Sequence, residues 1–514
     1  MTLALTVSAF AAWERAGFAQ IASRGELQKA ATKLGMMSGN PILGGILSGQ
    51  IDEAIPFADT FGTPRADGAV LIPLFFNTDK ASESAEKQLD AVEWAALYPV
   101  KCSKDEFLKK TATAIETNGV IRVASKSGDF GDDVNDAQDY DESEMKYNYI
   151  LFSKDGRWAA ISDKPCMLEA TLNCIAIAER APAGGQLLKT EINAKLINLT
   201  LAALKEAATT GKDAAECSDL DRANIAKFAS WGANMRGVEA YLAITNAGID
   251  FGGTLTTDGQ GELAEVFSQP LPAKPFAFAG ADALGAFAAA ENAGASTDLK
   301  ALWLALTECF KKYGIEFPFI TLETKPAGVQ RFVLDVKQLV KCINDEAYTA
   351  KFNALEDKQD ELGKALKDCG EQFKKPLTAK TPAQAVAFAI KGYAGTDLDT
   401  RLAATFPELA TSVKPCVAQF GSLYSTLIAT KSDLSAAAEP EVQPILEEIF
   451  MGLPPEAKAG IGGIGWRDGE KLNGLFRISA DELKLLGNAA NLATGMMMAQ
   501  AMQELGGDDD EAGE

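Results

Sequence analysis

Three Asp-Gly pairs, each between strand-like segments, constrain the fold of this chain more than any other feature of its sequence. They are Asp155-Gly156, Asp258-Gly259 and Asp468-Gly469. Asp-Gly between such segments is a strong signal for a β-hairpin with a type I′ turn, because glycine readily adopts positive φ. The first two pairs lie 103 residues apart and the last two 210, close to one and two periods of about 105 residues. We therefore predict a diverged duplication of a hairpin followed by a helix.

Apolar residues at helical spacing occupy much of the sequence between and after these hairpins. They predict helices over 192–208, 224–235, 284–292 and 352–373. Strands are predicted over 68–76, 119–124, 237–245, 317–323 and 329–336. Strand and helix do not alternate regularly. The predicted class is α+β: duplicated units of antiparallel hairpins or sheets packed against amphipathic helices, with no Rossmann or barrel pattern.

The length of 514 residues favours more than one domain. We expect a residual secretory signal over residues 1–12, where an apolar run ends in small residues. The run lacks a basic start, so an ordinary buried helix continuing through Trp13 and Phe18 is the alternative. Small residues at 293–296 suggest a boundary, which gives α+β domains over 13–295 and 296–505 and a disordered acidic tail over 506–514. No apolar stretch is long enough to predict a transmembrane span.

The sequence has no histidine and eight cysteines. The missing histidine excludes histidine-based triads and histidine-containing zinc sites. No two cysteines form C-x-x-C, so we expect neither structural zinc nor a thioredoxin-like pair. Cys166 and Cys174 lie about 12 Å apart if they share one helix, too far for a disulfide. Cys342 and Cys369 are likewise too far apart if the helical pattern between them is continuous. For the rest, free buried thiols and disulfides both remain open.

The formal net charge of −22 argues against a nucleic acid as partner. Some of the aspartate and glutamate residues are concentrated between residues 129 and 144. A calcium site could form there from carboxylates, although the order of residues does not match an EF-hand loop. A solvated loop is the other interpretation. The candidate calcium ligands are Asp132, Asp133, Asp136, Asp139 and Asp141.

Two glycine-rich segments resemble nucleotide-binding motifs and fail in context. Gly460, Gly462 and Gly465 match G-x-G-x-x-G but run into a predicted hairpin instead of a helix, so close packing of a strand explains them better. The segment 44–50 has glutamine where a P-loop needs lysine. We therefore predict no cofactor and name no catalytic or cofactor-binding residue.

The segments YNYILFSKDGRWAAISDKP and KFASWGANMRGVEAYLAITNAGIDFGGTLTTDGQG, at 147–165 and 227–261, share the order strand, turn, strand and helix. In this order the chain resembles large exported bacterial proteins of unknown function built from duplicated α+β units. The resemblance covers about half of the chain. It implies a periplasmic or extracellular location and supplies no catalytic residues.

These observations favour a non-enzymatic exported binding or structural protein of the bacterial cell envelope, whose partner is an envelope protein or ligand. The alternative is an extracytoplasmic hydrolase of glycans or peptides that uses carboxylates. Such an enzyme would place two facing carboxylates about 5–5.5 Å or 6.5–9.5 Å apart in a pocket. A cytoplasmic scaffold with reduced thiols is a third possibility. Whether the protein is an enzyme stays open at this point, with the non-enzymatic function favoured.

Overall fold

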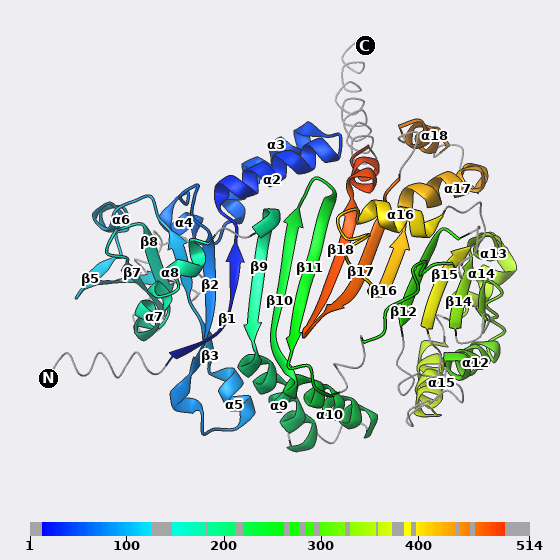
Figure 1. The fold of residues 1–514 in the computed structure, drawn as a ribbon, viewed down its shortest axis with the longest axis horizontal. Helices are drawn as coiled ribbons and strands as arrows, with labels where there is room; N and C mark the ends of the chain where they lie inside the picture. The colour runs from blue at the N-terminus through cyan, green and yellow to red at the C-terminus, as the bar shows by residue number, and fades with distance from the viewer. Residues whose placement is uncertain are drawn as a thin grey trace, which may run out of the picture. The chain divides into compact units, whose positions relative to one another are not determined.

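Figure 1 shows the computed structural model of the chain. It describes residues 13–125, 146–180, 183–210, 219–261, 268–277, 283–290, 299–323, 329–355, 358–372, 385–391, 397–437, 443–452 and 458–488. The chain divides into two compact units. Unit 1 comprises Met1–Gly35, Pro41–Thr245 and Phe251–Asp258, and unit 2 comprises Met36–Asn40, Asn246–Asp250 and Gly259–Glu514. The predicted signal segment, the acidic tail and the domain boundary at 295/296 lie outside the described residues.

Unit 1 is built on an antiparallel sheet. Hydrogen-bonded neighbours give the order β10, β9, β1, β2, β4, β8, β7, β6 and β5, and β3 also pairs with β2. The strands are β1 (Trp13–Ile21), β2 (Val70–Asn77), β3 (Val92–Trp94), β4 (Ala96–Pro99), β5 (Ile115–Thr117), β6 (Val120–Ser125), β7 (Lys146–Phe152), β8 (Trp158–Ser162), β9 (Gln186–Asn193) and β10 (Met235–Ile244). The next strand, β11 (Gly248–Thr257), lies beside β10 in Figure 1.

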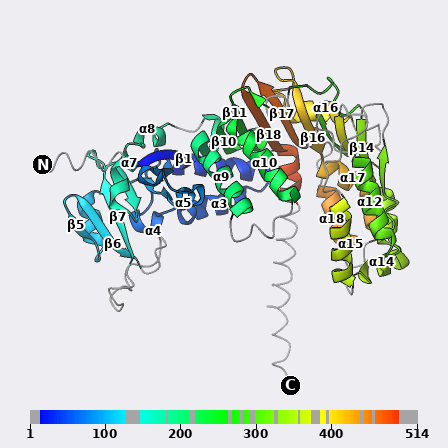
Figure 2. The same cartoon turned by 90° about the horizontal axis from the view of Figure 1, so that it is seen from below.

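Alternation along β2 and β4 gives this sheet two buried faces, because successive side chains of a strand point to opposite sides. Val70 and Tyr98 pack in one cluster with residues of α4 and α6. Their neighbours Leu71 and Leu97 pack in another with residues of α7 and α8. Figure 2 shows α8 and α4 on opposite sides of β1. The helices of unit 1 are α2 (Arg24–Met37), α3 (Pro41–Ala54), α4 (Ala58–Phe61), α5 (Ala85–Asp90), α6 (Lys104–Lys110), α7 (Leu168–Leu172), α8 (Ile175–Ala178), α9 (Ala194–Thr210) and α10 (Asp219–Ala233).

Unit 2 has a mixed sheet in the order β13, β14, β15, β12, β16, β17 and β18. The β14–β15 pair is parallel and the others are antiparallel. The strands are β12 (Gly285–Ala290), β13 (Ile320–Glu323), β14 (Val329–Asp335), β15 (Ala385–Lys391), β16 (Pro415–Gly421), β17 (Ile461–Asp468) and β18 (Lys471–Ser479). The helices are α12 (Leu299–Lys311), α13 (Val336–Ile343), α14 (Glu346–Asn353), α15 (Gln359–Gln372), α16 (Leu398–Thr405), α17 (Leu423–Ala437) and α18 (Gln443–Gly452). A further helix begins at residue 480.

The predicted α+β class is confirmed, and so are two of the three hairpins. β7 and β8 pair antiparallel around Asp155-Gly156, and the Asp155 carboxylate accepts a hydrogen bond from the Arg157 N–H at 3.1 Å. β17 and β18 pair from Asp468 to Lys471, so the turn residues are Gly469 and Glu470. Gly469 has a φ of 60° at the first central position, where type II′ turns place glycine. The turn therefore lies one residue later than predicted.

The middle hairpin is wrong. β11 ends at Thr257, and the described residues that follow Asp258-Gly259, 260–261, form no strand. The Asp258 N–H instead donates to the Asn234 carbonyl oxygen at 2.9 Å, and its carboxylate pairs with Arg236 at 2.6 Å. The strand predicted before Asp258 is present as β11, but its neighbour in unit 1 is the preceding strand, β10. Without the middle copy the internal duplication stays a prediction.

Three helix predictions are also wrong. Residues 285–290, expected in a helix, form β12, because pairing with β15 and β16 and the burial of Ala286 and Ala288 in the core outweigh the helix propensity of alanine. The expected helix over 352–373 is broken between α14 and α15. Trp13 and Phe18 belong to β1, so the buried-helix alternative fails there. The helices predicted at 192–208 and 224–235 correspond to α9 and α10. In the parts of the chain that the structure describes, no helix has the length and apolar character needed to cross a membrane.

Candidate functional site

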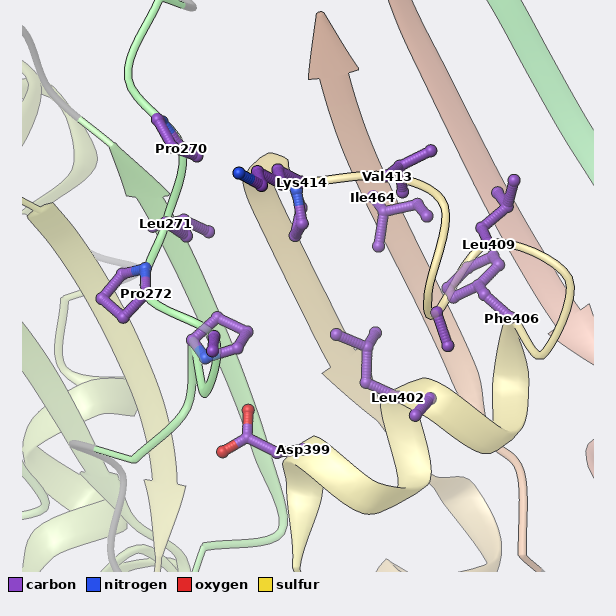
Figure 3. A pocket seen from close by; sticks show the side chains of 15 residues that line it. Pro270, Leu271, Pro272, Asp399, Leu402, Phe406, Leu409, Val413, Lys414 and Ile464 are labelled. Atoms are coloured by element: carbon purple, nitrogen blue, oxygen red, sulfur yellow. The ribbon is translucent and has the colours of Figure 1, made fainter.

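An apolar cavity of about 440 Å³ lies in unit 2 (Figure 3). Its walls are α16 with the loop that follows it, the segment 270–275, and the start of β16 with β17. This volume falls in the range of sites for small organic ligands, which are mostly apolar with a few polar groups. The lining side chains are Pro270, Leu271, Pro272, Ala273, Pro275, Asp399, Leu402, Ala403, Phe406, Leu409, Ala410, Val413, Lys414, Pro415 and Ile464.

The sequence of α16 explains how one wall forms. Asp397 caps the helix, because its carboxylate accepts hydrogen bonds from the Thr400 N–H at 3.2 Å and hydroxyl at 2.7 Å. Leu398, Leu402 and Phe406 recur every four residues and so share one helical face. All three are buried in the core cluster of unit 2. Leu402 and Phe406 therefore present a fixed apolar surface to the cavity.

The opposite wall is rich in proline. Pro270, Pro272 and Pro275 lack N–H groups, so this wall offers few hydrogen-bond donors. Two hydrogen bonds donated by backbone N–H groups hold the segment. The Leu271 N–H donates to the Pro415 carbonyl oxygen at 2.7 Å, and the Phe276 N–H donates to Asp399 Oδ1 at 2.9 Å. The segment is thus tied to β16 at one end and to α16 at the other.

Asp399 and Lys414 are the charged side chains among the described lining residues. Figure 3 shows them at opposite ends of the cavity, with the Asp399 carboxyl group turned from α16 toward the proline segment. Partial burial raises the pKa of Asp399, the Phe276 N–H opposes this, and the charge of Asp397 adds to it. Lys414 is exposed at the other end. The cavity therefore has an apolar body and one charge of each sign.

A buried ion pair supports the Phe406 wall from behind. Arg477 and Asp250 are only 3% and 5% exposed. Arg477 Nε and Nη2 donate to the two Asp250 oxygens at 2.6 and 2.7 Å. Nη1 donates to the Thr405 carbonyl oxygen at 2.9 Å, and the guanidinium lies 5.3 Å from the centre of the Phe406 ring. Burial opposes the charge of Arg477, but its bonds to Asp250 and Glu408 raise its pKa.

A second buried network fixes α16 to the chain before β17 and to α17. Arg401 donates to the Ser422 hydroxyl at 3.0 Å and to the Ala459 carbonyl oxygen at 3.1 Å, and it also contacts the Ser425 hydroxyl. Glu482, fully buried, accepts the Tyr424 N–H at 3.2 Å through Oε2. No described residue donates a hydrogen bond to Glu482 Oε1, and burial raises the pKa of this carboxyl group. These groups lie outside the cavity lining, so we assign them to the support of α16.

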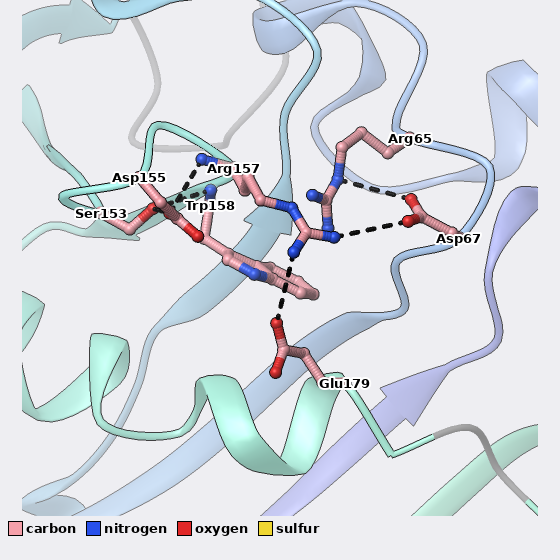
Figure 4. Close-up of polar contacts among 7 residues, drawn as sticks. All are labelled: Arg65, Asp67, Ser153, Asp155, Arg157, Trp158 and Glu179. Carbon is pink, nitrogen blue, oxygen red and sulfur yellow. Dashed lines mark hydrogen bonds and ion pairs between the residues drawn. The ribbon is translucent and has the colours of Figure 1, made fainter.

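A polar cluster in unit 1 is the other candidate (Figure 4). Asp67 lies 3.6 Å from Arg65 and 3.4 Å from Arg157, and Arg157 lies 4.0 Å from Glu179. The Arg65 guanidinium stacks at 5.1 Å from the ring centre of Trp158, which is fully buried. Each charged group has an opposite charge nearby, and the separations are those of weak surface pairs. This cluster therefore braces the β7–β8 hairpin and supplies no free reactive group.

The remaining predicted sites divide into those that the structure describes and those that it does not. Asp132, Asp133, Asp136, Asp139 and Asp141, the candidate calcium ligands, lie outside the described residues. Across the described ranges, no group of three or more acidic or cysteine side chains could hold a metal ion. Six cysteines whose side chains the structure describes are free: Cys102, Cys166, Cys174, Cys309, Cys342 and Cys416. Cys166 and Cys174 were predicted not to pair with each other.

The glycine-rich motif at 460–465 has the structural role that the sequence predicts. Gly462 lies on β17, where an added Cβ would come 2.9 Å from Phe406 Cε2. The strand therefore packs closely on a wall of the cavity. Residues 44–50 lie within α3, so they form no phosphate-binding loop.

Sequence reasoning missed the cavity, although part of its signal is visible. Two segments can be predicted to have an apolar face. One contains the prolines at 270, 272 and 275, and the other contains the apolar residues at 398, 402, 406, 409 and 413. Nothing in the sequence shows that these segments face one another. Comparisons with protein-family models, with curated proteins and with solved structures found no match to this chain.

Proposed function

We propose that this is a non-enzymatic, exported binding protein of the bacterial cell envelope, and that the cavity of unit 2 binds an apolar small-molecule ligand. The cavity itself supports this most strongly: its volume is about 440 Å³, its lining is mostly apolar, and buried polar networks support its walls. Large apolar side chains normally collapse on one another. A rigid apolar cavity is therefore suited to exchange water for a ligand.

The hydrolase alternative has less support. It needs a second carboxylate facing the first across the substrate. Asp399 is the only acidic side chain among the described residues that line the cavity. Its neighbour Asp397 is exposed and committed to capping α16.

Export is proposed from the apolar segment at residues 1–12 and from the resemblance to exported proteins. The six free thiols are also compatible with the cytoplasmic alternative. Counting thiols in protein purified in air without reductant separates the two locations. Eight reactive thiols after unfolding would argue against an oxidising compartment.

Titration with the uncharged fluorophore N-phenyl-1-naphthylamine tests the cavity. We expect saturable binding of one probe per chain, lost in Ala403→Trp because Ala403 lines the cavity. Ala404→Trp is the matched control, since Ala404 is the next residue of α16, is exposed and lies outside the lining. Binding that survives Ala403→Trp, or that is never saturable, would contradict the proposal. Catalytic turnover of a glycan or peptide, abolished by Asp399→Asn, would favour the hydrolase.

A further inference from the structure

We infer that the natural ligand of the cavity is a cationic amphiphile, a single protonated amine on an apolar body, with the amine bound by Asp399. This inference rests on the proposed function and specifies the ligand class. It is carried by the position and the hydrogen bonding of one carboxyl group among apolar walls.

One carboxylate oxygen of Asp399 accepts a hydrogen bond from a described residue, and the other can accept one from a ligand. Oδ1 accepts the Phe276 N–H at 2.9 Å, which holds the proline segment. No hydrogen bond from the described residues reaches Oδ2. Asp399 is half-buried and its Oδ2 atom is open to solvent, so a ligand that donates a hydrogen bond can reach this oxygen.

Charge favours an ammonium group over a neutral donor. A protonated amine donates a hydrogen bond and neutralises the carboxylate at once, and such charge-assisted bonds are stronger than neutral ones. The other charged groups near Asp399 are Asp397, which adds to the negative potential, and Lys274, which opposes it. The chain's net charge of −22 also attracts cations and repels anions over long distances.

The rest of the cavity determines the body of the ligand. Proline rings lie on one side, and Leu402 and Ile464 lie on the other, as Figure 3 shows. Neither kind of side chain donates a hydrogen bond, so polar groups along the body would lose contacts with water. Lys414, at the far end, disfavours a second positive charge. The ligand is therefore a monocation whose body is hydrocarbon or aromatic.

Calorimetric titration of the full chain with octylamine, octanol and octanoate tests the inference, because the three probes share one chain length. We expect octylamine to bind about tenfold more tightly than octanol at neutral pH, through the charge-assisted bond. Asp399→Asn keeps an acceptor for the Phe276 N–H but removes the charge. It should lower the octylamine affinity about tenfold and leave that of octanol within about twofold. Asp397→Asn, which retains a good capping side chain, is the matched control: it should leave the octanol affinity unchanged and lower the octylamine affinity much less than Asp399→Asn, because Asp397 only adds to the negative potential.

The possible outcomes separate this inference from the proposed function. Equal affinities for octylamine and octanol, or an unchanged octylamine affinity in Asp399→Asn, would overturn the inference while the cavity remained a binding site. Tightest binding of octanoate would overturn it in favour of recognition by Lys414. Binding of none of the probes, together with no binding of the uncharged fluorophore, would overturn the proposed function as well.

Discussion

Removing the negative charge of Asp250 is the most informative perturbation of the supports behind the cavity. In Asp250→Asn, Arg477 keeps its charge at a position that is 3% exposed. Breaking a buried ion pair by removal of one partner costs about 3–5 kcal/mol. Arg477 retains the half-exposed Glu408 at 2.7 Å and the Thr405 carbonyl oxygen. We therefore expect the lower end, a loss of about 3 kcal/mol in the unfolding free energy of unit 2.

Urea denaturation, combined with hydrogen exchange of peptides from β18 and α16, measures this loss where it arises. Asp67→Asn is the matched control, because Asp67 pairs with arginines at an exposed surface and should contribute at most about 1 kcal/mol. Arg477→Met added to Asp250→Asn should restore part of the stability, since no unpaired charge is then buried. A loss below about 1 kcal/mol in Asp250→Asn, with no effect on exchange in β18, would refute this reasoning.

Three further predictions concern turn geometry, thiols and pH. Gly469→Val should destabilise unit 2 by about 1 kcal/mol or more in urea denaturation, because its φ is 60°, whereas Gly474→Val, in open space on β18, should cost less. Cys166 should react rapidly with a thiol reagent in the native protein and buried Cys416, whose pKa burial raises, only after unfolding. Burial raises the pKa of Glu482, so the folded protein holds the proton of this carboxyl group more tightly than the unfolded chain does. The resulting contribution to the free energy of unfolding is complete below about pH 4.5, and it is lost as the pH rises through the raised pKa. Denaturation over a pH series should show this decline in unit 2, and Glu482→Gln should flatten it.

Strands rich in branched and aromatic side chains could be predicted from the sequence, because these side chains fit a pleated and largely buried surface. β2, β6, β10 and the β13–β14 pair all lie within a few residues of the predicted ranges. Partners are harder to predict. The strand signal before Asp258 was correct, but β11 lies beside β10 and is not followed directly by another strand. A local signal for a turn cannot reveal which strand lies alongside.

Predictions made from helix propensity were wrong where tertiary packing determines the secondary structure. The alanines of β12 favour a helix locally, yet β12 pairs with β15 on one side and β16 on the other, and Ala286 and Ala288 are buried in the core. The cavity could not be predicted for a related reason. Its walls come from residues within 270–275 and 399–415 and from Ile464, which are far apart in the sequence and come together only in the folded unit. The core role of Trp158, by contrast, follows from its position in a predicted hairpin.

Photo-crosslinking with an uncharged apolar diazirine probe, followed by peptide mapping, tests most directly the claim that unit 2 binds its ligand in this cavity. We expect the adducts to concentrate in two segments, Pro270–Pro275 and Leu402–Pro415, and to disappear in Ala403→Trp but not in Ala404→Trp. Adducts spread over exposed apolar residues of other elements, such as Ile42 and Ile46 on α3, would contradict the claim. So would adducts in the cavity segments that Ala403→Trp leaves unchanged.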